Sequence, residues 1–135
     1  MYCLDTDVLS ALIRPAPPAH LRRRLAALPP TEQCTTSVTL GELVYGAVRH
    51  DDARLAQRVE GLIRSAGAVL PFDEPAARIY ARIRAELETH GRKLDEPDLR
   101  IAAIALSRDL TLITGNVRHF ARVPDLRVEN WLEPG

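Results

Sequence analysis

The sequence predicts an α/β fold of three layers, in which a short, mostly parallel central sheet of about four to five strands is flanked by helices. Short apolar runs alternate along the chain with longer segments whose apolar residues recur at helical spacing. The short runs are continuously apolar, which is typical of parallel strands covered on both faces. At 135 residues the chain is predicted to form a single domain, residues 1–135.

The strand candidates are short apolar runs bounded by polar, Gly or Pro residues. They are residues 2–4, 34–36, 68–70, 111–114 and 126–128. Helical spacing fills the intervals, at residues 8–13, 21–28, 40–47, 55–63, 77–87 and 99–106 and in a short piece ending at Phe120. Ser37 or Thr39 is expected to cap the helix after the second strand, and Gly67 to end the next helix.

Composition limits the function classes without choosing one. The chain has 18 Lys and Arg and 18 Asp and Glu, so attraction to nucleic acid must come from local arrangement. Cys3 and Cys34 lie in predicted strands and are expected to be small buried hydrophobes. No apolar run reaches the roughly 20 residues that span a bilayer, and no signal-like segment opens the chain. We therefore expect a cytoplasmic protein without membrane association.

Oxygen-bearing side chains are predicted to gather at one edge of the sheet. Asp5 follows the first strand directly, and Glu42 lies about one turn into the helix after the second. Asp98 begins the helix before the fourth strand, and Asn116 follows that strand. The carboxyl ends of parallel strands converge on one crevice, so these side chains are expected to meet there.

Clustered carboxylates repel one another, so such a site either holds a proton or binds a cation. Oxygen ligands without His or Cys at metal spacing favour a hard ion, Mg²⁺ or Mn²⁺, over zinc. An ion held in this way polarises a phosphodiester and activates water. Phosphodiester hydrolysis is therefore the expected reaction class.

Segments of the chain resemble, in order, the four sequence blocks of PIN-domain ribonucleases, and the overall pattern is most similar to the VapC toxins of bacterial toxin–antitoxin pairs. The segments are YCLDTDVL (2–9), SVTLGEL (37–43), EPDLRIAA (96–103) and LITGNVRHF (112–120). The resemblance implies an Mg²⁺- or Mn²⁺-dependent endoribonuclease whose catalytic residues are Asp5, Glu42, Asp98 and Asn116. Of these, the resemblance makes Asp5, Glu42 and Asp98 the metal ligands, with Glu96, Thr6 and Thr114 as accessory residues.

Asn116 departs from the PIN pattern, in which this position is often acidic, although VapC-like members often carry asparagine there. An amide oxygen still ligates a metal or orients water, but it adds no charge. His119 stands where an acidic residue is common, and it is expected at the surface, outside the site.

The resemblance also implies partners: an RNA substrate, a VapB-like antitoxin and a second copy of the chain in a homodimer. The antitoxin would lay a helix and an extended tail along a groove formed by the helices after the first two strands. The apolar residues available for that groove are Leu9, Leu12, Ile13, Leu43, Val44, Val48 and Leu62. The arginines expected near the rim of the site, where they would contact the RNA backbone, are Arg14, Arg49, Arg100 and Arg118.

Two alternatives remain open. Residues 5–9 also resemble the nucleophile loop of haloacid-dehalogenase-type phosphatases, in which Asp5 would form an acyl phosphate. The order of Lys93, the later acidic residues and Thr114 differs from that family and counts against it. The second alternative is a non-catalytic PIN fold that binds RNA or a partner, for which Asn116 is the only support.

Overall fold

The central layer of the computed structural model, which describes residues 1–134, is a five-stranded sheet in which all neighbouring strands are parallel. The strand order is β3-β2-β1-β4-β5, so β1 is central. The strands are β1 (Tyr2–Leu4), β2 (Gln33–Thr36), β3 (Ala68–Leu70), β4 (Thr111–Ile113) and β5 (Arg127–Glu129). The predicted α/β fold with a short parallel sheet is confirmed.

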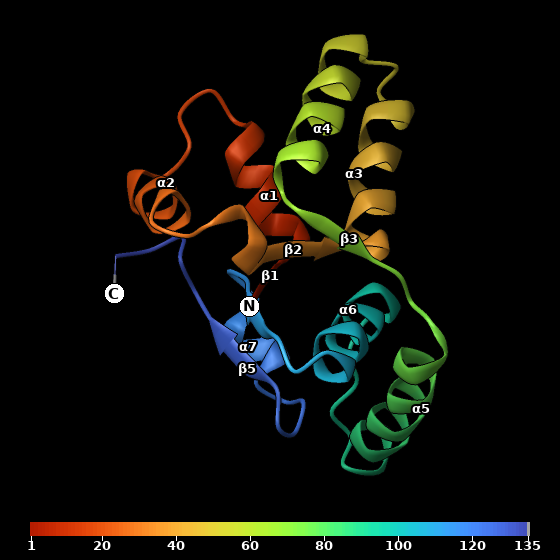
Figure 1. The fold of residues 1–135 in the computed structure, drawn as a ribbon. Helices are drawn as coiled ribbons and strands as arrows, with labels where there is room; N and C mark the ends of the chain where they lie inside the picture. The colour runs from red at the N-terminus through yellow and green to blue at the C-terminus, as the bar shows by residue number, and fades with distance from the viewer. Residues whose placement is uncertain (135) are drawn as a thin grey trace.

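Helices cover both faces of the sheet and complete the three layers (Figure 1). One group consists of α1 (Thr6–Ile13), α2 (Ala19–Ala26), α3 (Ser37–Arg49) and α4 (Ala53–Ser65). The other consists of α5 (Glu74–Thr89), α6 (Glu96–Ser107) and the short α7 (Val117–Phe120). A 3₁₀ turn, Pro30–Glu32, leads into β2. Among the described residues, no helix combines the length and the apolar character needed to cross a membrane.

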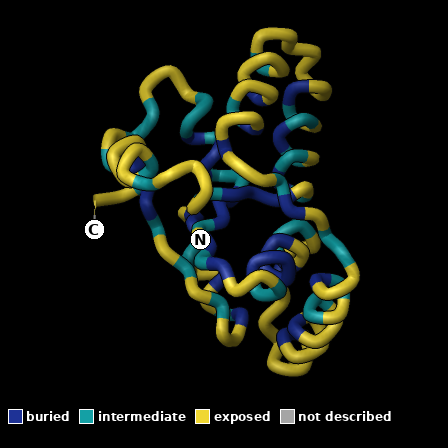
Figure 2. The backbone as a smooth tube through the Cα atoms, in the orientation of Figure 1, coloured by how far each residue is buried: buried dark blue, intermediate teal, exposed yellow. Residues whose placement is uncertain are grey.

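Side chains of the central strands alternate between two hydrophobic cores, one on each face of the sheet. Cys3 pairs in register with Cys34 and Leu112, and all three enter the core that α5 and α6 cover. Leu4 and Ile113 pair one residue later and enter the core beneath α1 and α4. Figure 2 shows buried backbone, in dark blue, running through the centre of the molecule. Both cysteines are free and buried, as predicted.

The cap of α3 differs from the sequence prediction. Neither Ser37 nor Thr39 caps this helix, because the Thr36 hydroxyl accepts the backbone N–H of Thr39 at 3.0 Å. The strand therefore runs into the helix without an intervening residue. Thr39 is instead buried inside the first turn, where its hydroxyl lies 3.2 Å from that of Thr6.

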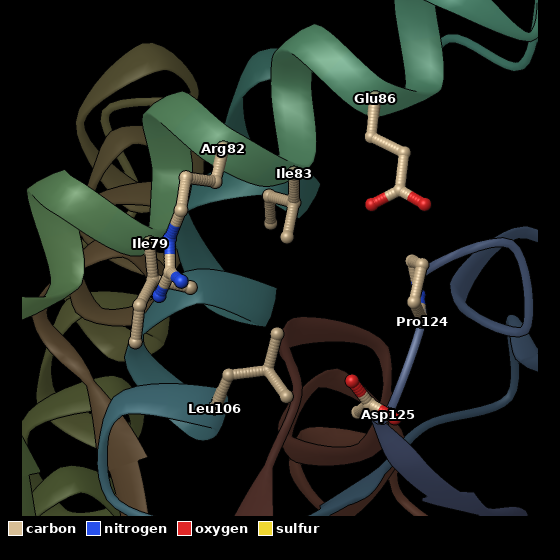
Figure 3. Close-up of a pocket in the computed structure, with 7 residues that line it drawn as sticks. All are labelled: Ile79, Arg82, Ile83, Glu86, Leu106, Pro124 and Asp125. Atoms are coloured by element: carbon tan, nitrogen blue, oxygen red, sulfur yellow. The ribbon is translucent and has the colours of Figure 1, made fainter.

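A hollow of about 330 Å³ opens between α5, the end of α6 and the loop before β5 (Figure 3). Ile83 and Leu106 line its apolar part, and Glu86 and Asp125 add carboxylates. The loop before β5 and the end of α6 lie at the amino ends of the strands, opposite the edge at which Asp5 follows β1. No predicted site residue lines this hollow.

Gly67 provides a test of the link between α4 and β3. Its φ is +82°, and an added Cβ would lie 2.3 Å from the Gln33 carbonyl oxygen. We predict that Gly67→Ala lowers the free energy of unfolding by about 1–3 kcal/mol. The matched change Gly61→Ala, inside α4 with nothing near its Cβ, should raise it by about 0.5–1 kcal/mol. Urea denaturation measures the free energy of unfolding of both variants. Equal changes in the two variants would contradict a strained turn at Gly67.

Candidate active site

Asp5 lies buried at the carboxyl end of β1, and one of its carboxylate oxygens lacks a partner. Its backbone N–H donates to the Ile113 carbonyl at 3.0 Å, which extends the β1–β4 pairing by one residue and positions the side chain. Oδ2 accepts a hydrogen bond from the Thr114 hydroxyl at 2.8 Å. Oδ1 is buried and accepts no hydrogen bond from the described residues. Burying an unsatisfied carboxylate oxygen is costly, so this atom marks a place for a ligand.

Burial and neighbouring carboxylates oppose the ionisation of Asp5 and Asp98. Removal from water is the main cause that raises the pKa of Asp5 from 3.8 to about 7, and the charges of Asp7 and Asp98 add to it. Removal from water also raises the pKa of Asp98 from 3.8 to about 6, and the Glu42 carboxylate is the next cause. Asp98 is therefore within electrostatic range of Asp5, Asp7 and Glu42.

Glu42 is positioned by hydroxyl groups. The Thr6 hydroxyl donates to Glu42 Oε1 at 2.7 Å. Because Thr6 follows Asp5 in the chain, this bond ties the Glu42 carboxylate of α3 to the carboxyl end of β1. Thr6 and Thr114, predicted as accessory residues, are thus placed beside Glu42 and Asp5 respectively.

Asp7 belongs to this cluster, although the sequence analysis did not assign it to the site. Its Oδ2 accepts the backbone N–H of Gly115 at 2.8 Å, and the Thr114 hydroxyl lies 3.4 Å from Oδ1. A Cβ at Gly115 would come within 2.8 Å of Asp7 Oδ2 and 2.7 Å of Leu132 Cδ1, so a larger residue here would displace the ends of these two side chains. The sequence feature that could have indicated Asp7 is its position two residues after Asp5, at the start of a predicted helix.

Asn116 lies at the edge of the cluster. Its backbone N–H donates to the Thr114 hydroxyl at 3.0 Å, and its side-chain Oδ1 contacts Nδ1 of His119. His119 is exposed, as predicted, but its charge lowers the pKa of Asp98, so it lies within electrostatic range of the site.

Glu96 is not brought to the other predicted residues. It accepts a hydrogen bond from the Tyr80 hydroxyl at 2.6 Å and forms ion pairs with Arg84 and Arg100, at 3.3 and 3.5 Å. The Tyr80 hydrogen bond is the main cause that lowers the pKa of Glu96. Residues two apart on a helix project about 200° apart, so Glu96 and Asp98 face different directions from α6. Arg100, expected at the rim of the site, is likewise engaged by Glu96.

The carboxylates influence one another, yet they do not surround a single point. Within residues 1–134, no three His, Cys, Asp or Glu side chains are arranged to hold a metal ion together. For Asp5, Glu42 and Asp98 to share a cation, their carboxylate oxygens must come closer together than they lie here. The donor set nevertheless fits a hard cation, which would give Asp5 Oδ1 a partner and offset the burial and repulsion that raise the pKa values of Asp5 and Asp98.

The parallel sheet with acidic residues at its carboxyl edge defines a class of protein, and comparison with known proteins identifies it. Residues 2–126 match the family model of the PIN domain, and the chain belongs to the PIN-domain family. It is 39% identical to the tRNA(fMet)-specific endonuclease VapC of Salmonella typhimurium, across 96% of this chain and 97% of that protein. It is 34% identical to the ribonuclease VapC2 of Haemophilus influenzae, across 97% and 98%.

A solved structure has the same fold. The crystal structure of VapBC2 from Rickettsia felis bound to a DNA fragment from its promoter superposes with a TM-score of 0.85, at 28% identity, over 96% of this chain and 98% of that one. The predicted resemblance to VapC-type PIN domains is confirmed. The phosphatase alternative finds no support among these relatives.

The raised pKa of Asp5 predicts an unusual dependence of stability on pH. Between about pH 4 and 7 the folded chain keeps a proton on Asp5 that the unfolded chain loses, so unfolding free energy falls as pH rises through this window. We expect a loss on the order of 2–4 kcal/mol without divalent cations. Asp5→Asn should remove the part of the loss that Asp5 causes and leave a smaller part from Asp98, whose pKa is also raised. Urea denaturation in EDTA at pH 5 and pH 8 measures it, and an unchanged pH dependence in Asp5→Asn would contradict the assignment.

Proposed function

We propose that this chain is an Mg²⁺- or Mn²⁺-dependent endoribonuclease that acts as the toxin of a toxin–antitoxin pair. The observation that carries the proposal is the buried, unpartnered Oδ1 of Asp5, whose pKa is raised by burial and by the neighbouring carboxylates. The names of the relatives support the reaction and the substrate class, because they describe ribonucleases and an endonuclease specific for tRNA(fMet). We therefore propose RNA as the substrate and tRNA as the first RNA to test.

Asp5, Glu42 and Asp98 are the residues that would hold the cation. The Thr114 hydroxyl occupies Oδ2 of Asp5 and leaves Oδ1 as the ligand atom, and the Thr6 hydroxyl occupies Oε1 of Glu42 in the same way. When bound, the cation would supply positive charge against the phosphodiester and make a water molecule easier to deprotonate, which activates that water as the nucleophile.

Asn116 contributes as a donor in this proposal. His119 already engages the Oδ1 atom of Asn116, so the side-chain NH₂ group is left to hydrogen-bond a phosphate oxygen of the substrate. Such a neutral donor orients the phosphate without adding another negative charge to the crowded site. This role differs from the metal-ligating amide oxygen considered from the sequence.

The proposed antitoxin would bind the outer face of α3. Val48 and Tyr45 on this helix are large hydrophobic residues with exposed fractions of 71% and 61%, and the exposed outer turns of α3 and α4 are visible in Figure 2. Leu9 and Leu43, expected from the sequence to line the groove, are buried in the core and are not available. The titles of related structures describe VapBC complexes, which supports a partner of this kind. A homodimer stays a proposal based on the family resemblance.

RNA cleavage by the purified chain tests the proposed function. We predict cleavage of tRNA, including a tRNA(fMet) transcript, with Mg²⁺ or Mn²⁺ and none in EDTA. Asp98→Asn should reduce the rate about a hundredfold or more, because it removes a charged ligand. Glu96→Gln, two residues away on the same helix, should retain activity, since its carboxylate is bound by Tyr80 and arginines.

Equal losses in Asp98→Asn and Glu96→Gln would contradict the site assignment. Intact RNA with the wild-type chain, folded and supplied with either cation, would favour the non-catalytic PIN alternative.

Val48→Asp tests the proposed antitoxin surface. We predict that this change weakens binding to the antitoxin encoded by the neighbouring reading frame about tenfold or more, because it places a charge in an apolar contact. Cleavage of RNA should be unaffected. Glu60→Lys on the exposed side of α4 serves as the control for a general charge effect. Isothermal titration measures both affinities, and unchanged binding by Val48→Asp would place the partner elsewhere.

A further inference from the structure

A second hollow, of about 450 Å³, begins beside the acidic cluster and extends away from it along α1. At one end it is lined by Asp7 and by the turn containing Gly115 and Asn116. At the other end it is lined by Arg14, which immediately follows α1. The hollow is therefore continuous with the proposed active site and has an arginine at its far end.

The helical repeat explains this arrangement. Asp7 and Ala11 are spaced i and i+4, so they lie on one face of α1, and Arg14, the first residue after the helix, lines the same hollow. Seven residues of helix span roughly 10 Å, which is up to about three nucleotide steps at the ~3.4 Å rise of a stacked strand. An RNA strand with its scissile phosphate at the carboxylates would thus bring a neighbouring phosphate within reach of Arg14.

Arg14 is available for such a contact. It is exposed, and it takes part in no ion pair or side-chain hydrogen bond within residues 1–134. Of the other predicted rim arginines, Arg100 pairs with Glu96 and Arg49 donates to the Tyr45 hydroxyl. Arg118 is also exposed and without such a partner among the described residues, but it does not line this hollow. A guanidinium without an internal partner can bind a phosphate through two parallel hydrogen bonds.

The wall of the hollow is apolar but not aromatic. Pro18 and Leu132 face it together with Ala11, and no Phe, Tyr or Trp lines it. Without an aromatic platform, a base has only the Arg14 guanidinium to stack on. The hollow is therefore suited to a ribose and its phosphate, so sequence preference at this position should be weak.

We propose that this hollow is the subsite for RNA flanking the scissile bond, and that Arg14 is the residue that binds a backbone phosphate there. This inference rests on the proposed ribonuclease function and names part of its substrate-binding surface. Charge favours RNA over an antitoxin segment as the occupant. Arg14 at one end of the hollow offers two hydrogen bonds to a phosphate, and the other end opens toward the proposed cation.

Two variants of Arg14 test the subsite, with an arginine at the opposite edge of the sheet as control. Arg14→Gln removes the charge, Arg14→Lys retains it without the bidentate fork, and Arg64→Gln changes an exposed arginine at the end of α4. The substrate is a tRNA transcript that the wild-type chain cleaves, and the binding probe is the same RNA labelled with fluorescein. Thermal unfolding establishes that each variant is folded.

We expect Arg14→Gln to raise KM about tenfold with little change in kcat, and Arg14→Lys to recover part of the loss. Fluorescence anisotropy over a range of NaCl concentrations should show the slope of log K against log salt reduced by about 0.7, the value for one lost phosphate contact on a single strand. Arg64→Gln should match the wild type in both measurements.

The outcomes separate this inference from the proposed function. If the wild type cleaves RNA but Arg14→Gln and Arg64→Gln have the same KM and salt slope, the subsite is wrong and the ribonuclease assignment stands. If Arg14→Gln instead loses affinity for the antitoxin while KM is unchanged, the hollow holds a protein segment and the inference is overturned. RNA binding that depends on Arg14 without any cleavage would support the subsite and refute the catalytic proposal.

Discussion

The energetic cost of keeping Asp5 out of water is the constraint on which the site depends. A carboxylate that is 4% exposed, with one oxygen lacking a partner, is stable only as the neutral acid or beside a positive charge. The protein increases this cost by placing Asp7 and Asp98 within electrostatic range. A cation bound at this point would supply the positive charge that stabilises the ionised Asp5 carboxylate, and the same charge would attract an RNA phosphate.

The short strands of the fold are what keep Asp5 out of water. β1 has only three residues, so the chain passes from a buried apolar strand into Asp5 without a solvated loop, and the Asp5 N–H still pairs with β4. Hydrophobic cores on both faces of the sheet exclude water beneath that position. α1 then begins at Thr6, whose hydroxyl brings in Glu42 from α3. The length of β1, the burial of its end and the start of α1 together position the carboxylates of Asp5 and Glu42.

The order of strand, carboxylate and helix could be predicted because the spacing of apolar residues along the chain indicates where each strand and helix lies. The parallel sheet follows from the continuously apolar strands, and the position of Asp5 follows from the end of β1. Asp7 was missed because its contact with Gly115 joins residues far apart in the chain. Glu96 was misplaced for a related reason, since its direction depends on Tyr80 and Arg84, which no motif specifies. The spacing of residues in a single sequence does not show which side chains from different helices and loops will contact one another.

The central claim is that Asp5, Glu42 and Asp98 share one hard cation. Anomalous scattering from crystals of the chain soaked in MnCl₂ tests it most directly. The account predicts a manganese peak within about 2.3 Å of Asp5 Oδ1, with oxygens of the other two carboxylates also coordinated after a change of rotamer. A fully ordered site without a manganese peak there, in crystals whose protein cleaves RNA with Mn²⁺, would contradict it.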